Sequence, residues 1–324
     1  MKAMYRILGP FLALALVLAY GESAAQSYPS KTIKFVDGYP PGGGTDIIGR
    51  VVAQKLTERV GQPVIVENRP GANSITAAEY VARSAPDGYT LFIGATGAMV
   101  YNPGLYTRLP YDPVKDFVPI TMFATGPLVF AVHPSVPVKS IKELIELAKT
   151  KPGGMFYAAG AAPFHVAAEL FKKQAGVDMV HVPYKGSPAS ITGAVAGDTS
   201  LVVVVIAPAL PHLRAGKIRG LAVTGTRRSS FLRDLPTMRE SGLDFECISW
   251  TALFAPAGTP PAIIDKLYRE VSAILKTDSV RERFASLSYE TGEMGMPPAE
   301  LSAYHRADLA KWTKVIKDLN IRAD

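Results

Sequence analysis

The sequence predicts an α/β protein with two lobes whose sheets are mostly parallel. First, segments with the apolar pattern of strands alternate with segments of helical periodicity almost throughout the chain. Second, residues 201–210 form an apolar run broken at Pro208, which is typical of a buried parallel strand. Third, a chain of 324 residues is long enough for two domains.

The first predicted unit starts with a Gly-rich turn between a strand and a helix. A strand at 33–36 leads into Tyr39-Pro-Pro-Gly-Gly-Gly-Thr-Asp46, and apolar residues at helical spacing follow from Ile47 to Leu56. The remaining elements, in chain order, are a strand at 64–67, a turn at 68–71, a helix at 74–83 and a strand at 90–94.

Two places in the chain predict crossings between the lobes. Strands at 118–123 and 128–133 are separated by only a short break, and a later strand at 248–255 brings the chain back. We expect hinges near 124–127 and 248–251. The lobes that follow are residues 26–125 with 249–324 (lobe 1) and residues 126–248 (lobe 2).

The second lobe continues the alternation of helices and strands. Ser140-x-x-Glu143 is a capping box, which predicts a helix from there to about residue 150. Ser187 and Pro188 are expected as the N-cap and first residue of a later helix. The other elements are strands at 155–159, 179–182, 201–206 and 220–224 and a helix at 164–175.

Helices are expected to fill the C-terminal part of the chain. One follows Pro260-Pro261, one follows a second capping box, Ser279-x-x-Glu282, and the last begins near Pro298. Apolar residues of the last helix recur at three- and four-residue spacing, which predicts that it packs onto the first lobe.

Residues 1–25 have the features of a cleaved secretory signal peptide. Lys2 and Arg6 precede an apolar segment too short to span a bilayer, and Ser23-Ala24-Ala25 supplies the small residues of a cleavage site. The single cysteine, Cys247, cannot form an internal disulfide, and export without disulfides favours the bacterial periplasm. A formal net charge of +7 without a dense Lys/Arg run suits acidic small molecules and argues against nucleic acid.

The Gly-rich turn predicts a site for a small anion. Its glycines leave backbone N–H groups bare at a helix N-terminus, where the helix dipole is positive. A P-loop is excluded because the frame from Gly44 to Val51 lacks the Lys and the Ser/Thr. A dinucleotide site is excluded because Ile47 replaces the third glycine. A tight turn without a ligand is the alternative.

Signatures of enzymes are missing from the sequence. Neither Gly-x-Ser-x-Gly nor His-Glu-x-x-His occurs, and the five histidines show no metal-ligand spacing. We therefore expect no catalytic residue, no metal and no cofactor. A solute-binding receptor is favoured over a periplasmic α/β enzyme, which would need a nucleophile with its base or an acid/base pair.

Eight motifs, spread over the whole mature chain, resemble those of one family in their usual order. They are Tyr39-Pro-Pro-Gly-Gly-Gly-Thr-Asp46, Gly61-Gln-Pro-Val64, Glu67-Asn-Arg-Pro-Gly71, Ala85-Pro-Asp-Gly-Tyr-Thr90, Leu109-Pro-Tyr-Asp-Pro113, Val132-His-Pro-Ser-Val136, His181-Val-Pro-Tyr-Lys-Gly186 and Phe254-Ala-Pro-Ala-Gly-Thr259. The chain resembles the extracytoplasmic solute receptors of tripartite tricarboxylate transporter systems, the Bug family.

This resemblance implies a type II periplasmic-binding-protein fold whose cleft closes on a small carboxylate. It also implies delivery of the ligand to membrane permease subunits, although the sequence leaves open a receptor that feeds a signalling partner instead. We expect a monomer. The positions that match the family's binding loops are Tyr39, Pro41, Gly43, Gly44, Thr45, Asp46, Thr96, Gly97, Ala159, Gly160, Ala161, Phe164, His165, Ile206 and Ala207.

Departures from the family pattern concern the ligand. The loop at 159–165 is short and carries Phe164, and the Asp common near the end of the next strand is absent from 202–207. A less polar second lobe favours a cyclic, aromatic or long-chain carboxylate over a tricarboxylate. Asp37 either orients a group in the cleft or bonds local backbone, and His165 either contacts ligand or bonds at a helix start.

Overall fold

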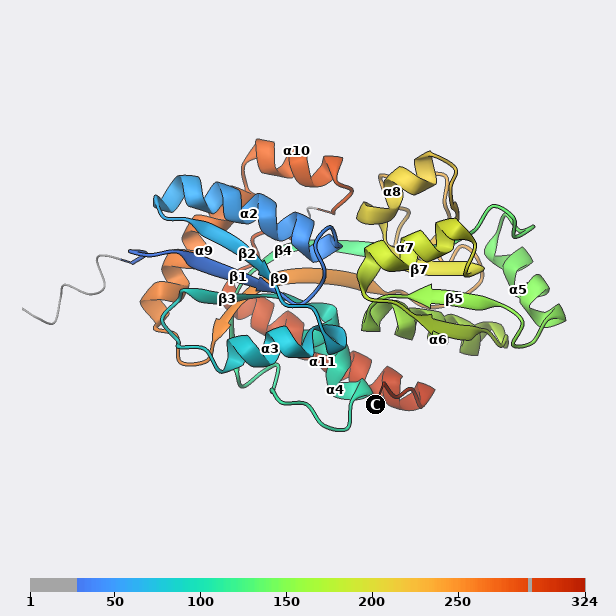
Figure 1. The fold of residues 1–324 in the computed structure, drawn as a ribbon, viewed down its shortest axis with the longest axis horizontal. Coiled ribbons are helices and arrows are strands. Elements are labelled where there is room, and N and C mark those ends of the chain that lie inside the picture. Colours follow the sequence, from blue (N-terminus) through green and yellow to red (C-terminus); the bar gives the residue numbers. More distant parts are fainter. Residues whose placement is uncertain (1–27, 291–292, 324) are drawn as a thin grey trace, which may run out of the picture.

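Two α/β lobes lie side by side, and two long strands run through both (Figure 1). The computed structural model describes residues 28–290 and 293–323. The expected signal peptide therefore lies outside the described residues. The α/β class and the two-lobe arrangement predicted from the sequence are confirmed.

The first lobe has three parallel strands with helices on both faces. The strands are β1 (Ile33–Asp37), β2 (Val64–Asn68) and β3 (Thr90–Ala95), with β1 between the other two. The helices are α2 (Gly44–Val60), α3 (Ile75–Ala82), α9 (Pro261–Leu275), α10 (Asp278–Ser286) and α11 (Pro298–Leu319). Helix α2 covers the sheet because Ile48, Val52 and Leu56, spaced along one helix face, are buried.

Three short helical segments of the first lobe were not predicted. They are η1 (Ala72–Ser74), the π-helical segment η2 (Gly97–Tyr101) and α4 (Asn102–Leu105). Helix α11 packs against η2 and α4 and buries Leu301, Trp312 and Ile316. The last helix therefore lies on the first lobe as expected, and it also reaches the second lobe, where Lys173 Nζ donates to the Asp318 carbonyl.

The second lobe is built from strands of four or five residues. They are β5 (Phe156–Ala159), β6 (Val180–Pro183), β7 (Leu201–Val205) and β8 (Arg219–Val223). Its helices are α5 (Ile141–Thr150), α6 (Ala162–Ala175), α7 (Gly186–Ala196) and α8 (Ile206–Arg214). Helices α6, α7 and α8 each begin close behind a strand, so their N-termini face the first lobe (Figure 1).

A single strand, β4 (Phe117–Val132), replaces the two strands predicted for the first crossing. It pairs antiparallel with β9 (Ile248–Pro256) from Phe117 to Pro127, with two shifts of register. The sheet order is β2-β1-β3-β9-β4-β7-β5-β6, with β8 also on β4. Strands β1 to β3 and β5 to β7 pair in parallel as expected. Every described pair that includes β4 or β9 is antiparallel, and this includes the pairing of β8 with β4.

Helix starts differ from the prediction in three places. The Ser140 capping box is confirmed, since its side chain accepts from the Glu143 N–H. The capping box predicted at Ser279 is wrong, because α10 already begins at Asp278 and Thr277 occupies the N-cap position. Ser187 is not an N-cap, because α7 begins one residue earlier, behind Lys185. Helix α8 was missed: Pro208 stands in its first turn, where no N–H is needed.

Candidate functional site: a cavity between the lobes

A cavity with about 600 Å³ of empty space, counting the part open to solvent, lies between the two lobes. Both lobes and the crossing strands contribute to its wall. The lining residues are Tyr39, Pro40, Gly43, Gly44, Thr45, Ile48, Ala95, Thr96, Gly97, Ala124, Thr125, Gly126, Ala161, Pro163, Phe164, Ser187, Val205, Ser249, Thr251 and Tyr289. None of these side chains is an Asp, Glu, Lys, Arg or His, so backbone and hydroxyl groups supply the polarity of the wall.

The first turn of α2 brings bare backbone N–H groups to this wall. Gly43 occupies the N-cap position and has no side chain to cap the helix. The helical bonds begin with the Ile47 N–H, which donates to the Gly43 carbonyl. The N–H groups of Gly44, Thr45 and Asp46 therefore have no helical acceptor and carry the positive end of the helix dipole.

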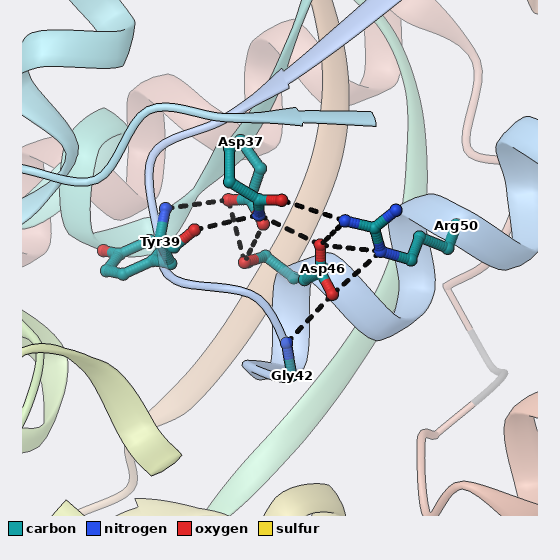
Figure 2. A network of polar contacts seen from close by, with 7 residues as sticks. Asp37, Tyr39, Gly42, Asp46 and Arg50 are labelled. Carbon is teal, nitrogen blue, oxygen red and sulfur yellow. Dashed lines mark hydrogen bonds and ion pairs between the residues drawn. The ribbon is translucent and has the colours of Figure 1, made fainter. Parts of the chain in front are cut away.

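Two carboxylates hold the Gly-rich loop in place through hydrogen bonds from residues of the loop (Figure 2). Asp46 accepts from the Gly42 N–H and from Asn68, each at 2.9 Å, and forms an ion pair of 2.8 Å with Arg50. Burial alone would raise the pKa of Asp46, but the bonds from Arg50, Gly42 and Asn68 outweigh it and lower that pKa. Asp46 is thus satisfied within lobe 1.

Asp37 is the second of these carboxylates. It accepts from the Tyr39 N–H at 3.1 Å and from the Thr45 hydroxyl at 2.9 Å. Its side chain is fully buried, and this burial raises its pKa to about 7, although the two hydrogen bonds act in the opposite direction. The structure shows both roles predicted for Asp37, which bonds the local backbone at Tyr39 and orients the hydroxyl of Thr45, a residue of the cavity wall.

The wall contributed by the second lobe is mostly apolar. Ala161, Pro163 and Phe164, at the start of α6, and Val205, at the end of β7, all line the cavity. Val205 lies opposite the Gly-rich loop, because a Cβ added at Gly44 would sit 3.2 Å from its Cγ2 atom. The ligand-facing wall of this lobe therefore matches the reduced polarity predicted from the departures in sequence.

Hydroxyl groups gather where the crossing strands form the floor of the cavity. The Thr96 and Ser249 hydroxyls are 3.1 Å apart and share a hydrogen bond, and Thr125 and Thr251 lie beside them. Tyr289, which follows α10, donates its hydroxyl to the Gly44 carbonyl at 2.6 Å. Sequence reasoning found only Thr96 among these residues. The alternation along β9 could have indicated Ser249 and Thr251, but no local signal marks Tyr289.

The predicted site residues divide into two groups. Those that line the cavity are Tyr39, Gly43, Gly44, Thr45, Thr96, Gly97, Ala161 and Phe164. Those that do not are Pro41, Asp46, Ala159, Gly160, His165, Ile206 and Ala207. The Tyr39 hydroxyl lies directly over Gly97, which leaves no room for a side chain there.

His165 faces a neighbouring pocket instead, together with Ala159, Gly160 and His181. Its Nδ1 lies 2.8 Å from the Tyr157 hydroxyl, which donates to Glu169, and its ring stacks on His181. Burial and the adjacent His181 lower the pKa of His165 to about 4, so the ring is neutral at pH 7. This bonding at a helix start is one of the two roles predicted for His165.

The described residues contain no group of three or more His, Cys, Asp or Glu side chains that could hold a metal ion. A search of the same residues finds no helix that is both long and apolar enough to cross a membrane.

A family model described as "Tripartite tricarboxylate transporter family receptor" matches residues 48–321 of the chain. The chain belongs to this family. Protein BugT of Bordetella pertussis is 32% identical to it over 322 residues, which is 98% of each chain. A UPF0065 protein from the tcbD-tcbE intergenic region of Pseudomonas sp. (strain P51) is 32% identical over 318 residues, covering 96% of this chain and 94% of the relative.

Solved structures of relatives share the fold. The structure "R. palustris Rpa4515 with adipate" superposes with a TM-score of 0.88 at 36% identity and covers 91% of this chain and 99% of its own. MatC (Rpa3494) from Rhodopseudomonas palustris, with bound malate, gives 0.85 at 30% identity, over 89% and 100%. The periplasmic binding protein BugD gives 0.86 at 29%, over 92% and 100%. The resemblance found in the motifs is confirmed: the chain is a Bug-type solute-binding receptor by family.

Proposed function

We propose that this protein captures a small organic carboxylate in the periplasm and delivers it to the membrane permease of a tripartite tricarboxylate-type transporter. The observation that carries the proposal is the uncapped first turn of α2 on the wall of the interlobe cavity. The N–H groups of Gly44 and Thr45, which line the cavity, and of Asp46, next in the same turn, are donors that a carboxylate satisfies, and the helix dipole favours its negative charge. No lysine or arginine side chain is needed.

The cavity also supports a ligand with an apolar body. Phe164, Pro163 and Val205 offer little to a tricarboxylate, whose additional charged groups need polar partners to replace lost water. A long-chain, cyclic or aromatic carboxylate fits such a wall better. The relatives whose structures hold adipate and malate bind small carboxylates, and of the two only adipate has the longer apolar chain that this wall favours.

Binding without catalysis is the simplest use of this cavity. Its lining supplies donors and apolar contacts but no acid/base pair or activated nucleophile.

We propose the lobe boundaries given above, residues 26–125 with 249–324 and residues 126–248, and export by a signal peptide cleaved after Ala25. The positively charged start and small-residue cleavage site support export.

Thermal unfolding with a panel of acids tests the proposal. We expect a carboxylate at a hundred times its dissociation constant to stabilise the protein by roughly 2.7 kcal/mol, which is a readily measured shift. The panel comprises citrate, malate, glutamate, adipate, benzoate and terephthalate, each beside its amide. If the amides stabilise the protein as well as the acids do, the proposal of a carboxylate-binding site is wrong. Stabilisation by citrate alone would contradict the inference drawn from the apolar wall.

A further inference from the structure

Tyr289 contacts the start of α2 from a segment that lies far away in the sequence. Its hydroxyl donates to the Gly44 carbonyl at 2.6 Å, and the residue lines the cavity although it is only 6% exposed. The lack of a side chain at Gly44 allows this approach, because an added Cβ would lie 3.1 Å from the Tyr289 hydroxyl. The tyrosine and the glycine are therefore fitted to each other.

The segment that carries Tyr289 is anchored on a strand that joins the two lobes. The Glu290 N–H donates to the Thr125 carbonyl of β4 at 3.1 Å, and the Tyr289 N–H donates to the Phe284 carbonyl at 3.0 Å. The rings of Phe284 and Tyr289 also pack together, with 6.1 Å between their centroids. These backbone and ring contacts hold the tyrosine hydroxyl at the Gly44 carbonyl.

The Tyr289 hydroxyl remains a donor at physiological pH. Burial, together with the nearby Asp37 and Asp46, raises the pKa of Tyr289, so the phenol stays protonated. Its acceptor, the Gly44 carbonyl, belongs to the same peptide unit as the N–H of Thr45. Thr45 lines the cavity, and its N–H has no helical acceptor. The hydroxyl therefore binds one end of a peptide whose other end is a free donor at the cavity wall.

We propose that Tyr289 is a positioning residue for the anion site, which acts on a bound carboxylate through the Gly44–Thr45 peptide. This inference rests on the proposed function, because it takes the carboxylate to be bound by the first turn of α2. A hydrogen bond accepted by a peptide carbonyl polarises the peptide and makes its N–H a stronger donor.

Tyr289 also fixes the orientation of this peptide. The Thr45 side chain is held separately, since its hydroxyl donates to Asp37 at 2.9 Å. Side chain and peptide are thus both set in place before a ligand arrives, which lowers the entropic cost of binding. Loss of the tyrosine hydroxyl should weaken carboxylate binding roughly fivefold, the effect of one hydrogen bond between neutral groups.

A direct contact between Tyr289 and the ligand is the alternative. A phenol hydroxyl has a single proton, so donation to Gly44 leaves it only lone pairs, which a carboxylate cannot use. Tyr289 can donate to the ligand only if it releases Gly44. The two possibilities therefore differ in whether the Gly44 carbonyl keeps its partner when an acid binds.

Titration calorimetry on Tyr289→Phe measures the effect on affinity. The matched control is Tyr28→Phe, because the Tyr28 hydroxyl is also buried and donates to a glycine carbonyl, that of Gly88, at 2.7 Å without lining the cavity. The probes are citrate, malate, glutamate, adipate, benzoate and terephthalate. The melting temperature of each variant without ligand shows that it is folded.

NMR follows the peptide itself. Isotope labels on the glycine carbonyl carbon and the threonine nitrogen restrict the spectrum to Gly–Thr pairs, which in this sequence are Gly44–Thr45, Gly225–Thr226 and Gly258–Thr259. Without ligand, Tyr289→Phe should move the Gly44 carbonyl signal to lower chemical shift and leave the other two pairs unchanged. When an acid binds to the wild type, the Thr45 amide proton should move to higher chemical shift, while the Gly44 carbonyl signal keeps its position.

The expected result is weaker binding by Tyr289→Phe of every acid that binds to the wild type, with Tyr28→Phe unchanged. Equal affinity of Tyr289→Phe and the wild type overturns the proposal, as does an equal loss in Tyr28→Phe. A wild-type Gly44 carbonyl signal that moves to lower chemical shift on binding also overturns it, even if Tyr289→Phe does not fold. If none of the six acids binds to the wild type, the proposed function fails and this inference with it; every other outcome leaves the proposed function standing.

Discussion

At the scale of single residues, Asp37 is the side chain whose charge bears most directly on the cavity. It lies beneath the Gly-rich loop and holds the Tyr39 N–H and the Thr45 hydroxyl, both in residues of the cavity wall. Burial raises its pKa to about 7, so the carboxyl is partly protonated near neutral pH. A protonated Asp37 repels a bound carboxylate less than an ionised one.

Asp37 should make stability depend on pH. Because the folded-state pKa is raised from 3.8 to about 7, its contribution is fully present below pH 4 and is lost as pH rises through 7. At about 1.4 kcal/mol per pKa unit, the whole effect amounts to roughly 4 kcal/mol. We expect Asp37→Asn to gain stability relative to the wild type between pH 4 and 8, measured by urea unfolding.

Asp244→Asn serves as the control for this prediction, because that carboxylate is 90% exposed. Its difference from the wild type should change little over the same range of pH. A constant difference between Asp37→Asn and the wild type at pH 4 and pH 8 would show that Asp37 stays ionised in the folded protein.

At the scale of elements, the starts of helices decide where donors are free. Helix α5 satisfies its own first turn, since Ser140 accepts from the Glu143 N–H and Glu143 accepts from the Lys139 N–H. Helices α2 and α7, which open onto the cavity, have no side-chain cap. Helices away from the cavity, such as α9 and α11, also lack a side-chain cap, so what distinguishes α2 is that its free donors lie on the cavity wall.

The two capping boxes seen in the sequence give a matched test. Ser140→Ala removes a cap that the structure contains and should destabilise the protein by about 1 kcal/mol. Ser279→Ala should cost less than about 0.5 kcal/mol, because α10 begins before Ser279 and makes no side-chain cap. Urea unfolding of both variants measures the difference, and equal losses would contradict the assigned start of α10.

Local patterns predicted the elements more reliably than their ends or partners. The strand and helix around the Gly-rich turn were predictable because apolar periodicity and glycines act within a few residues. The fusion of the two predicted strands into β4 was not predictable from local patterns. The residues that join them stay extended because they pair with β9, more than 100 residues away in the chain. Helix α8 was missed because Pro208 was interpreted as a break rather than as a first-turn residue.

The same distinction applies to the cavity. The Gly-rich loop has its own signature, whereas Tyr289 reaches the Gly44 carbonyl from a segment 245 residues away. Ser187 was noted as a cap, and only the described fold shows its hydroxyl facing a cavity. Residues brought together by the packing of two lobes leave no local pattern in the sequence.

At the scale of the whole molecule, the two lobes touch across the cavity. Pro40 of the first lobe lies against Gly186 of the second, where an added Cβ would come within 2.9 Å of its Cδ. The lobes are joined by β4 and β9, which pair around Thr125 and Gly126. Two connecting strands with local shifts of register can bend together, so we expect the lobes to open and close about this point.

A bulky residue at position 205 should hold the lobes apart. Val205 faces Gly44 across the cavity, and the larger side chain of Val205→Trp has no room there when the lobes are closed. Small-angle scattering of the wild type, first stripped of ligand, should show a smaller radius of gyration after a saturating carboxylate is added. Val205→Trp should keep the larger radius and bind the acid weakly. Val180→Trp, at a position 41% exposed on β6, should behave like the wild type. Contraction of Val205→Trp to the wild-type radius would show that closure does not bring Val205 against the Gly-rich loop.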